Sequence, residues 1–118
     1  TLGHVAMIPN SARYPAYVLS QSQMKVSVNR KIADPQYIVH YFLSERGRSE
    51  IASRTMATGV PHINLAVLRG LPVVLPPLEL QRRFASILAA QYELQDTLDN
   101  ALGRTEELIT SLVQRAFS

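Results

Sequence analysis

The sequence predicts an α+β fold: a small domain of mixed strands and helices, followed by one long C-terminal helix of the coiled-coil type. Four short apolar or alternating segments, bounded by loop-forming residues, are typical of strands; they are residues 4–8, 16–20, 24–28 and 72–75. From Phe84 onward, apolar residues recur at spacings of three and four, which is typical of an amphipathic helix. We therefore divide the chain into a domain at residues 1–77 and a helix at residues 78–118. Because residues 4–8 already read as a strand, we expect the first residues to belong to the middle of a domain, so that residues 1–77 are part of one.

The first predicted strands are joined by loops that carry basic side chains. Arg13 stands beside Tyr14 in the loop after Pro9, where a cation next to an aromatic ring suits contacts to phosphate or bases. The third strand, MKVSV, alternates apolar and polar residues and presents Lys25 on its polar face. It leads into Arg30 and Lys31, the densest positive cluster in the chain.

Helices are predicted next. Asp34 is a good N-cap, and Pro35 at the first helical position gives up an N–H that would have no partner there. The core-facing stripe of this helix consists of Tyr37, Ile38, Tyr41 and Phe42. We expect the helix to end or kink at residues 44–47, a second short helix at residues 49–56 and a helical turn at residues 65–68.

The end of the second helix and the loop that follows it gather polar groups. Arg54, the hydroxyl of Thr58 and the imidazole of His62 lie near one another in sequence, together with Gly59. Such side chains suit contacts to base edges or phosphates.

A proline pair separates the last predicted strand from the long helix. Pro76 and Pro77 lack N–H groups, so they stop strand pairing, and Pro77 also biases Pro76 away from helical backbone. We expect a stiff corner at this point.

The long helix has a heptad pattern that also includes Gln91, Ala101, Thr105 and Arg115 at core positions. From residue 81 its 38 residues would extend roughly 57 Å, so its apolar stripe exceeds what the small domain can cover. The stripe is wider than a two-stranded seam requires, which favours a bundle of more than two helices. The alternative is a helix folded back on its own domain. The predicted pairing residues are Phe84, Ile87, Leu88, Leu94, Leu98, Leu102, Leu108, Ile109 and Leu112.

Charge is uneven along the 118 residues, whose net charge is +3. Residues 1–80 carry eight Lys or Arg against four acids, whereas residues 81–118 carry four against five. A polyanionic partner would therefore meet the first part of the chain. The absence of cysteine excludes disulfides and thiolate metal sites and favours an intracellular protein. No apolar run is long enough to cross a membrane, and no signal peptide is visible.

Nothing in the sequence indicates catalysis or a metal site. His4, His40 and His62 are far apart and no acidic residues cluster with them. Phosphate-binding loops, dinucleotide fingerprints and nucleophile elbows are missing. We expect a protein that is not an enzyme.

The order of several motifs resembles the specificity subunit of type I restriction-modification systems. The matching positions are DPQYI at residues 34–38, Gly59 with HIN at residues 62–64, and the proline-rich residues 72–78 with Gln81 and Phe84. The resemblance covers nearly the whole chain, and its proline-rich segment is the most specific part. It corresponds to the second part of a target-recognition domain and its following spacer helix.

The resemblance implies a non-catalytic reader of double-stranded DNA in the cytoplasm. In that family, long helices pair antiparallel, set the spacing between half-sites and hold the modification subunits, which work with restriction subunits. S-adenosylmethionine is expected in the modification subunits, and no cofactor in this chain. The DNA-contact candidates are Arg13, Lys25, Arg30, Lys31, Arg54, Thr58 and His62. Two alternatives remain: a helical assembly module without DNA binding, and the recognition domain of a fused restriction-methylation enzyme.

Overall fold

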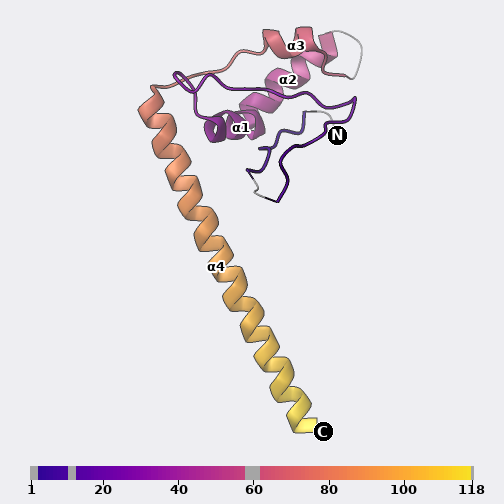
Figure 1. Ribbon diagram of the computed structural model, residues 1–118, viewed down its shortest axis with the longest axis vertical. Coiled ribbons are helices and arrows are strands. Elements are labelled where there is room, and N and C mark those ends of the chain that lie inside the picture. Colours follow the sequence, from indigo (N-terminus) through magenta and orange to yellow (C-terminus); the bar gives the residue numbers. More distant parts are fainter. Residues whose placement is uncertain (1–2, 11–12, 58–61, 118) are drawn as a thin grey trace. The chain divides into compact units, whose positions relative to one another are not determined.

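The computed structural model describes residues 3–10, 13–57 and 62–117. These residues form four helices: α1 (Pro35–Leu43), α2 (Glu45–Ala57), α3 (Leu65–Gly70) and α4 (Leu78–Phe117) (Figure 1). The chain divides into two compact units, Thr1–Arg82 and Arg83–Ser118, which we call unit 1 and unit 2. Unit 1 contains α1, α2, α3 and the first turn of α4, and unit 2 is the rest of α4.

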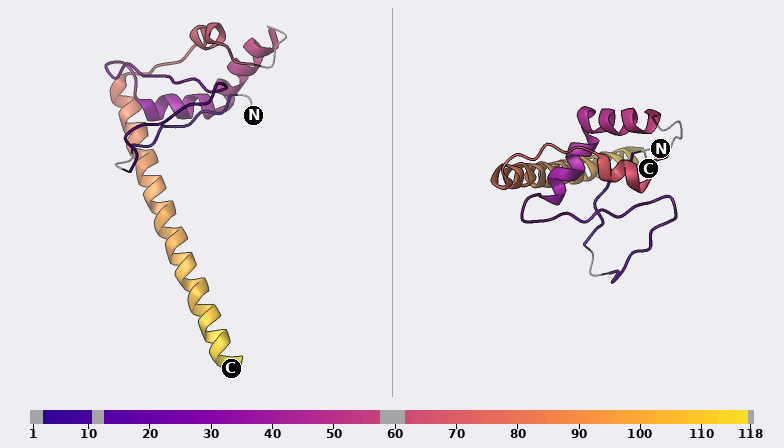
Figure 2. Two further views of the ribbon diagram at one scale, coloured as in Figure 1. Left: turned by 45° about the vertical axis from the view of Figure 1, so that its right-hand side comes forward. Right: turned by 90° about the horizontal axis from the view of Figure 1, so that it is seen from above.

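The α+β prediction is wrong, because the structure is helical and its described residues contain no strand. Residues 4–8, 16–20, 24–28 and 72–75 have irregular backbone, visible as the uncoiled trace in Figures 1 and 2. A strand requires backbone pairing with a neighbouring segment. In the described part of residues 13–33, the backbone hydrogen bonds instead close turns, such as Gln23 N to Ser20 O at 3.1 Å. Most apolar side chains of this region are therefore exposed, and 97% of Val18 is accessible.

The predicted start of α1 is confirmed. The Asp34 carboxylate accepts hydrogen bonds from Gln36 N at 2.9 Å and Tyr37 N at 3.2 Å, and Pro35 occupies the first turn. The carboxylate thereby satisfies two N–H groups that lack partners inside the helix.

Ser44 ends α1 and begins α2. Its N–H donates to His40 O and Tyr41 O, and its hydroxyl accepts a hydrogen bond from Gly47 N at 3.2 Å. The predicted break at residues 44–47 is confirmed, but α2 begins at Glu45 instead of residue 49 because Ser44 caps both helices. A Cβ on Gly47 would lie 2.6 Å from Phe42 Cα, so only glycine fits this junction.

Unit 1 has a small core. Among the described residues, the buried apolar side chains are Ala33, Ile51 and Val67. Thr55 is also buried, and its hydroxyl donates to Ile51 O at 2.9 Å and Ala52 O at 3.0 Å. Asn64 caps α3 by accepting a hydrogen bond from Val67 N at 2.8 Å.

Two tyrosines of α1 hold the segment that leads to α4. The Tyr37 hydroxyl donates to Val74 O, and the Tyr41 hydroxyl donates to Pro72 O at 3.4 Å. The two rings lie 6.3 Å apart between centroids. The carbonyl groups of Pro72 and Val74 therefore bind this segment to α1.

Burial raises the pKa of Tyr37, the nearby Tyr41 raises it further, and Arg46 lowers it. The unfolded pKa of tyrosine is about 10, and a higher pKa in the folded state means that folding favours the neutral phenol. The resulting contribution to stability is complete below the unfolded pKa and is lost as the pH rises through the folded pKa. We expect the free energy of unfolding to fall above about pH 10, and this fall to shrink in Tyr37→Phe. Urea unfolding across a pH series measures it, with Tyr92→Phe on α4 as the control. Equal pH dependence in Tyr37→Phe and the wild type would contradict the assignment.

Gln81 is the only described residue whose side chain is fully buried. Its Oε1 accepts a hydrogen bond from Asp34 N at 2.8 Å. Its Nε2 donates to Ile32 O at 3.0 Å and to Pro76 O at 2.7 Å. We call these three hydrogen bonds the Gln81 bridge. They join the first turn of α4 to the N-terminal side of α1 within unit 1.

The predicted long helix is confirmed. It begins at Leu78, where Pro77 O accepts hydrogen bonds from Leu80 N at 2.9 Å and Gln81 N at 3.2 Å. Its 40 residues run without a break to Phe117, a length of about 60 Å (Figure 2). None of the helices in the described part of the chain combines the length and apolar character needed to span a bilayer.

Candidate nucleic-acid interface

Arg30 and Lys31 lie in a turn of defined geometry, residues 29–31, which we call the basic turn. Asn29 Oδ1 accepts a hydrogen bond from Lys31 N at 3.1 Å. Asn29 O accepts from Ile32 N at 3.1 Å and from Ala33 N at 3.0 Å. Both basic side chains are exposed, so the turn presents two adjacent cations to solvent.

Arg13 belongs to an aromatic cluster on an exposed loop. Its guanidinium carbon lies 5.5 Å from the centre of the Tyr14 ring, within the range of a cation–π interaction. The Tyr14 and Tyr17 rings meet edge to face, with centroids 6.3 Å apart. Sequence reasoning paired Arg13 with Tyr14 but missed Tyr17, which lies three residues further along.

Lys25 lines a groove of about 430 Å³ in unit 1. The groove also contains Arg69, an exposed residue of α3 that was not among the candidates from the sequence. Its other lining residues are Val26, Ser27, Val28, Ile38, Phe42, Leu68, Leu71 and Val73. The structure thus brings together two cations from distant parts of the chain around one mostly apolar groove.

Arg54 is less available than the sequence suggested. Its Nε lies 3.8 Å from Glu50 Oε2, one turn earlier in α2. Its Nη1 would lie 3.6 Å from a Cβ added to Gly70, at the end of α3. The side chain therefore packs between two helices, although part of it remains accessible.

The last two candidates lie between α2 and α3. His62 is exposed, two residues before the Asn64 cap of α3. Thr58 lies outside the described residues.

Arg46 and Arg48 at the start of α2 are also exposed. Sequence reasoning counted their charge without proposing them as contacts.

Unit 2 exposes the predicted pairing stripe. Leu98 is 56% accessible and Leu108 is 60% accessible. Several other members are more than half exposed: Ile87, Leu94, Leu102, Ile109 and Leu112. Phe84 and Leu88 are partly covered. The helix therefore carries a long apolar surface that unit 2 itself does not bury.

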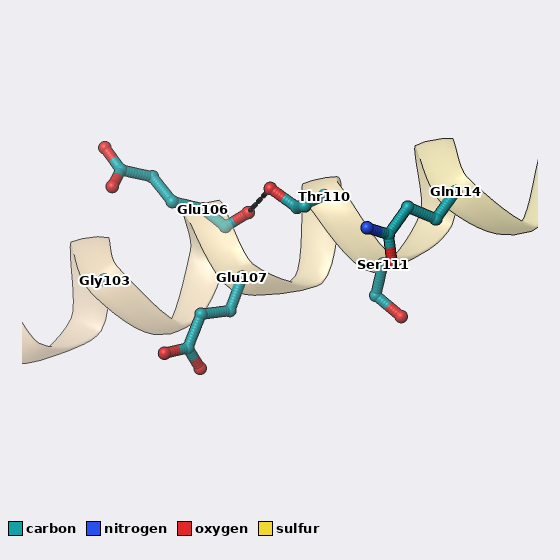
Figure 3. Close-up of a pocket in the computed structure, with 6 residues that line it drawn as sticks. All are labelled: Gly103, Glu106, Glu107, Thr110, Ser111 and Gln114. Atoms are coloured by element: carbon teal, nitrogen blue, oxygen red, sulfur yellow. Dashed lines mark hydrogen bonds between the residues drawn. The ribbon is translucent and has the colours of Figure 1, made fainter.

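The polar face of α4 has a shallow depression of about 440 Å³, shown in Figure 3. Its residues all come from this one helix: Gly103, Glu106, Glu107, Thr110, Ser111 and Gln114. The Thr110 hydroxyl is occupied by a hydrogen bond to Glu106 O at 3.0 Å. This surface lacks an opposing wall within the described part of unit 2, and it marks the solvent side of an amphipathic helix.

A metal centre is not indicated. In the part of the chain that the structure describes, no three His, Cys, Asp or Glu side chains come close enough to hold an ion.

Comparison with known proteins identifies the family to which this chain belongs. The family described as "Type I restriction modification DNA specificity domain" matches residues 1–108. The "Type I restriction enzyme MjaVIII specificity subunit" of Methanocaldococcus jannaschii is 26% identical over 101 residues. That alignment covers 86% of this chain and 23% of the relative, so the chain spans about a quarter of the relative's length. No solved structure matches the chain.

Proposed function

Because this chain belongs to the family of type I restriction modification DNA specificity domains, which recognise DNA sequence, we propose that it is a non-catalytic DNA reader of a type I restriction-modification enzyme. The observation that carries the proposal is the family match over residues 1–108. The surplus of basic residues in residues 1–80 supports it, because phosphate contacts dominate the affinity of proteins for DNA.

The contacts we propose are Arg13, Lys25, Arg30, Lys31, Arg54, Thr58 and His62. The basic turn is the best supported of them, because its two cations are exposed and its backbone is held by three hydrogen bonds. Arg54 is the weakest, because it packs against α3. Most of these groups would bind phosphates and position the domain, while a smaller number would read base edges.

The long helix would serve assembly. We propose that its apolar stripe pairs with a second helix, from another copy or from another part of a specificity subunit, and so sets the distance between two DNA half-sites. The same helix would hold the modification subunits, which would carry S-adenosylmethionine, while the restriction subunits join the same complex. The exposure of Leu98 and Leu108 supports this role. The work of such a complex on DNA would place it in the cytoplasm.

A second candidate is an assembly module that binds no DNA of its own. The uncovered stripe of α4 favours it equally well, since both functions require a helical partner. The two candidates differ in the role of the basic residues, which an assembly module does not need.

The Arg30→Ala and Lys31→Ala variants separate these candidates. For a phosphate contact, each change should weaken binding to all duplex sequences and reduce the magnitude of the salt slope, log Kobs against log[salt], by about 0.9. A base-reading residue would instead lose about 1 to 3 kcal/mol on one sequence only. Fluorescence anisotropy with duplexes of several sequences, over a salt series, measures both quantities.

The matched control is Arg104→Ala, which removes an exposed arginine from unit 2. It should leave the affinity and the slope unchanged. If the basic-turn variants bind DNA as the wild type does, the basic turn is not a contact. If charge reversal of the basic candidates is also tolerated, the assembly module is the better description; these are Arg13, Lys25, Arg30, Lys31 and Arg54.

A further inference from the structure

The strongest feature that the proposed function does not use is the Gln81 bridge. A glutamine amide offers two N–H donors and a carbonyl acceptor. In Gln81 both kinds of group are engaged by backbone partners, at distances between 2.7 and 3.0 Å. A fully buried amide with such partners holds the backbone segments that it contacts in one geometry.

Two of those partners flank Ala33. Gln81 Nε2 donates to Ile32 O, and Gln81 Oε1 accepts from Asp34 N. Ala33 between them is buried, with 5% of its surface accessible. The backbone at residues 32–34 is therefore clamped by one side chain from a residue 47 or more positions further along the chain.

The clamped backbone is continuous with the basic turn. Ile32 N and Ala33 N both donate to Asn29 O, at 3.1 and 3.0 Å. Lys31 directly precedes Ile32, and its own N–H is held by Asn29 Oδ1. Ile32 is thus fixed on one side by the turn and on the other by Gln81, so a displacement of residues 32–34 would move the turn with them.

We propose that Gln81 is the positioning residue of the basic turn: it touches no DNA, but it holds Arg30 and Lys31 where two neighbouring phosphates can be bound together. This inference rests on the proposed function, because it presumes that the basic turn contacts DNA. It makes the phosphate contacts depend on a side chain at the start of α4.

The chemistry of the bridge requires glutamine. Asparagine keeps the amide but is one methylene shorter, so it cannot span from α4 to both Ile32 O and Asp34 N. Glutamate keeps the reach and the acceptor for Asp34 N, but as a carboxylate it has no N–H for Ile32 O or Pro76 O. Gln81→Asn and Gln81→Glu therefore break the bridge in different ways.

The test measures the salt slope of the full chain with a mixed-sequence DNA duplex. For Gln81→Asn and for Gln81→Glu we expect the magnitude of the slope to fall by about 1 to 2, the value for one or two lost phosphate contacts. Partial unfolding alone reduces the active fraction and not the number of phosphates bound by each folded molecule. Far-UV circular dichroism at the same salt concentrations checks that the variants are folded.

The matched control is Val67→Ala. It removes buried apolar surface in α3, within the same unit, at a residue that forms none of the hydrogen bonds of the basic turn or the Gln81 bridge, and should weaken the fold without changing the slope. A double-mutant cycle completes the design. Adding Gln81→Asn to the Arg30→Ala and Lys31→Ala pair should produce no further change in slope, because the contacts that Gln81 positions are already gone.

Three outcomes are decisive. The inference is supported if the Gln81 variants have a smaller slope and if Gln81→Asn causes no further reduction when it is added to the basic-turn pair. An unchanged slope for them, beside a reduced slope for the basic-turn pair, overturns the inference and leaves the proposed contacts standing. An unchanged slope for the basic-turn pair itself overturns both the contact assignment and the inference.

Discussion

Replacing Leu98 and Leu108 together with aspartate is expected to abolish the association of α4 with a partner helix. Both side chains lie on the predicted seam and are more than half exposed in unit 2. A leucine contributes about 1.5 to 3 kcal/mol when it is fully buried. Aspartate forfeits that contribution, and its charge must also be removed from water if the helices still pair. We expect a loss of about 3 kcal/mol or more, which is at least about a hundredfold in Kd.

Light scattering of the chain at micromolar concentration measures this effect. The wild type should be a dimer or larger, and the double aspartate variant a monomer. Asn100→Asp is the control for charge, because it adds one negative charge, as each leucine replacement does, at an exposed position outside the heptad seam. A wild type that is monomeric at these concentrations would contradict pairing of the helix with a second copy.

Replacing Gln81 with leucine is expected to destabilise unit 1 by about 2 to 4 kcal/mol. Leucine has a similar size but leaves Asp34 N, Ile32 O and Pro76 O without their partner. A buried polar group that loses its hydrogen bond costs about 1 to 3 kcal/mol. Because Ile32 is exposed, water can reach part of the site, and the three costs will not add in full. The expected loss is a large fraction of the stability of a small domain.

Urea unfolding measures this loss, followed by tyrosine fluorescence, because four of the five tyrosines lie in unit 1. Gln95→Leu is the control, because Gln95 is exposed on α4 and its only described bond is to Asp99 Oδ1 at 3.0 Å. That change should leave the unfolding midpoint nearly unchanged. A Gln81→Leu variant as stable as the wild type would show that the bridge contributes no net stability.

Local signals in the sequence were sufficient to predict α1 and α4. Asp34 and Pro35 predicted the start of α1 because capping involves residues close together in the chain. The heptad pattern predicted α4 for the same reason. Ser44 was assigned to a break, but its second role as the cap of α2 was not recognised, so the start of α2 was placed too late.

Contacts between residues far apart in the chain could not be predicted from local sequence patterns. Alternation in residues 24–28 indicates which side chains could share a face, but it cannot supply a neighbouring segment with which to pair. Arg54 reads as a loop cation, and its packing against Gly70 depends on how α2 and α3 meet. Gln81 was noticed only as a position in a family motif. Its role depends on partners at residues 32, 34 and 76, which no spacing rule connects.

The Gln81 bridge also defines where the chain can be recombined. A chimera that takes residues 1–82 from one protein keeps Gln81 with its three backbone partners, because unit 1 ends at Arg82. A crossover placed at Pro76 and Pro77, where the sequence most visibly changes character, would instead supply Gln81 from one parent and Ile32 and Asp34 from the other. The boundary that keeps unit 1 intact therefore lies one turn inside the long helix.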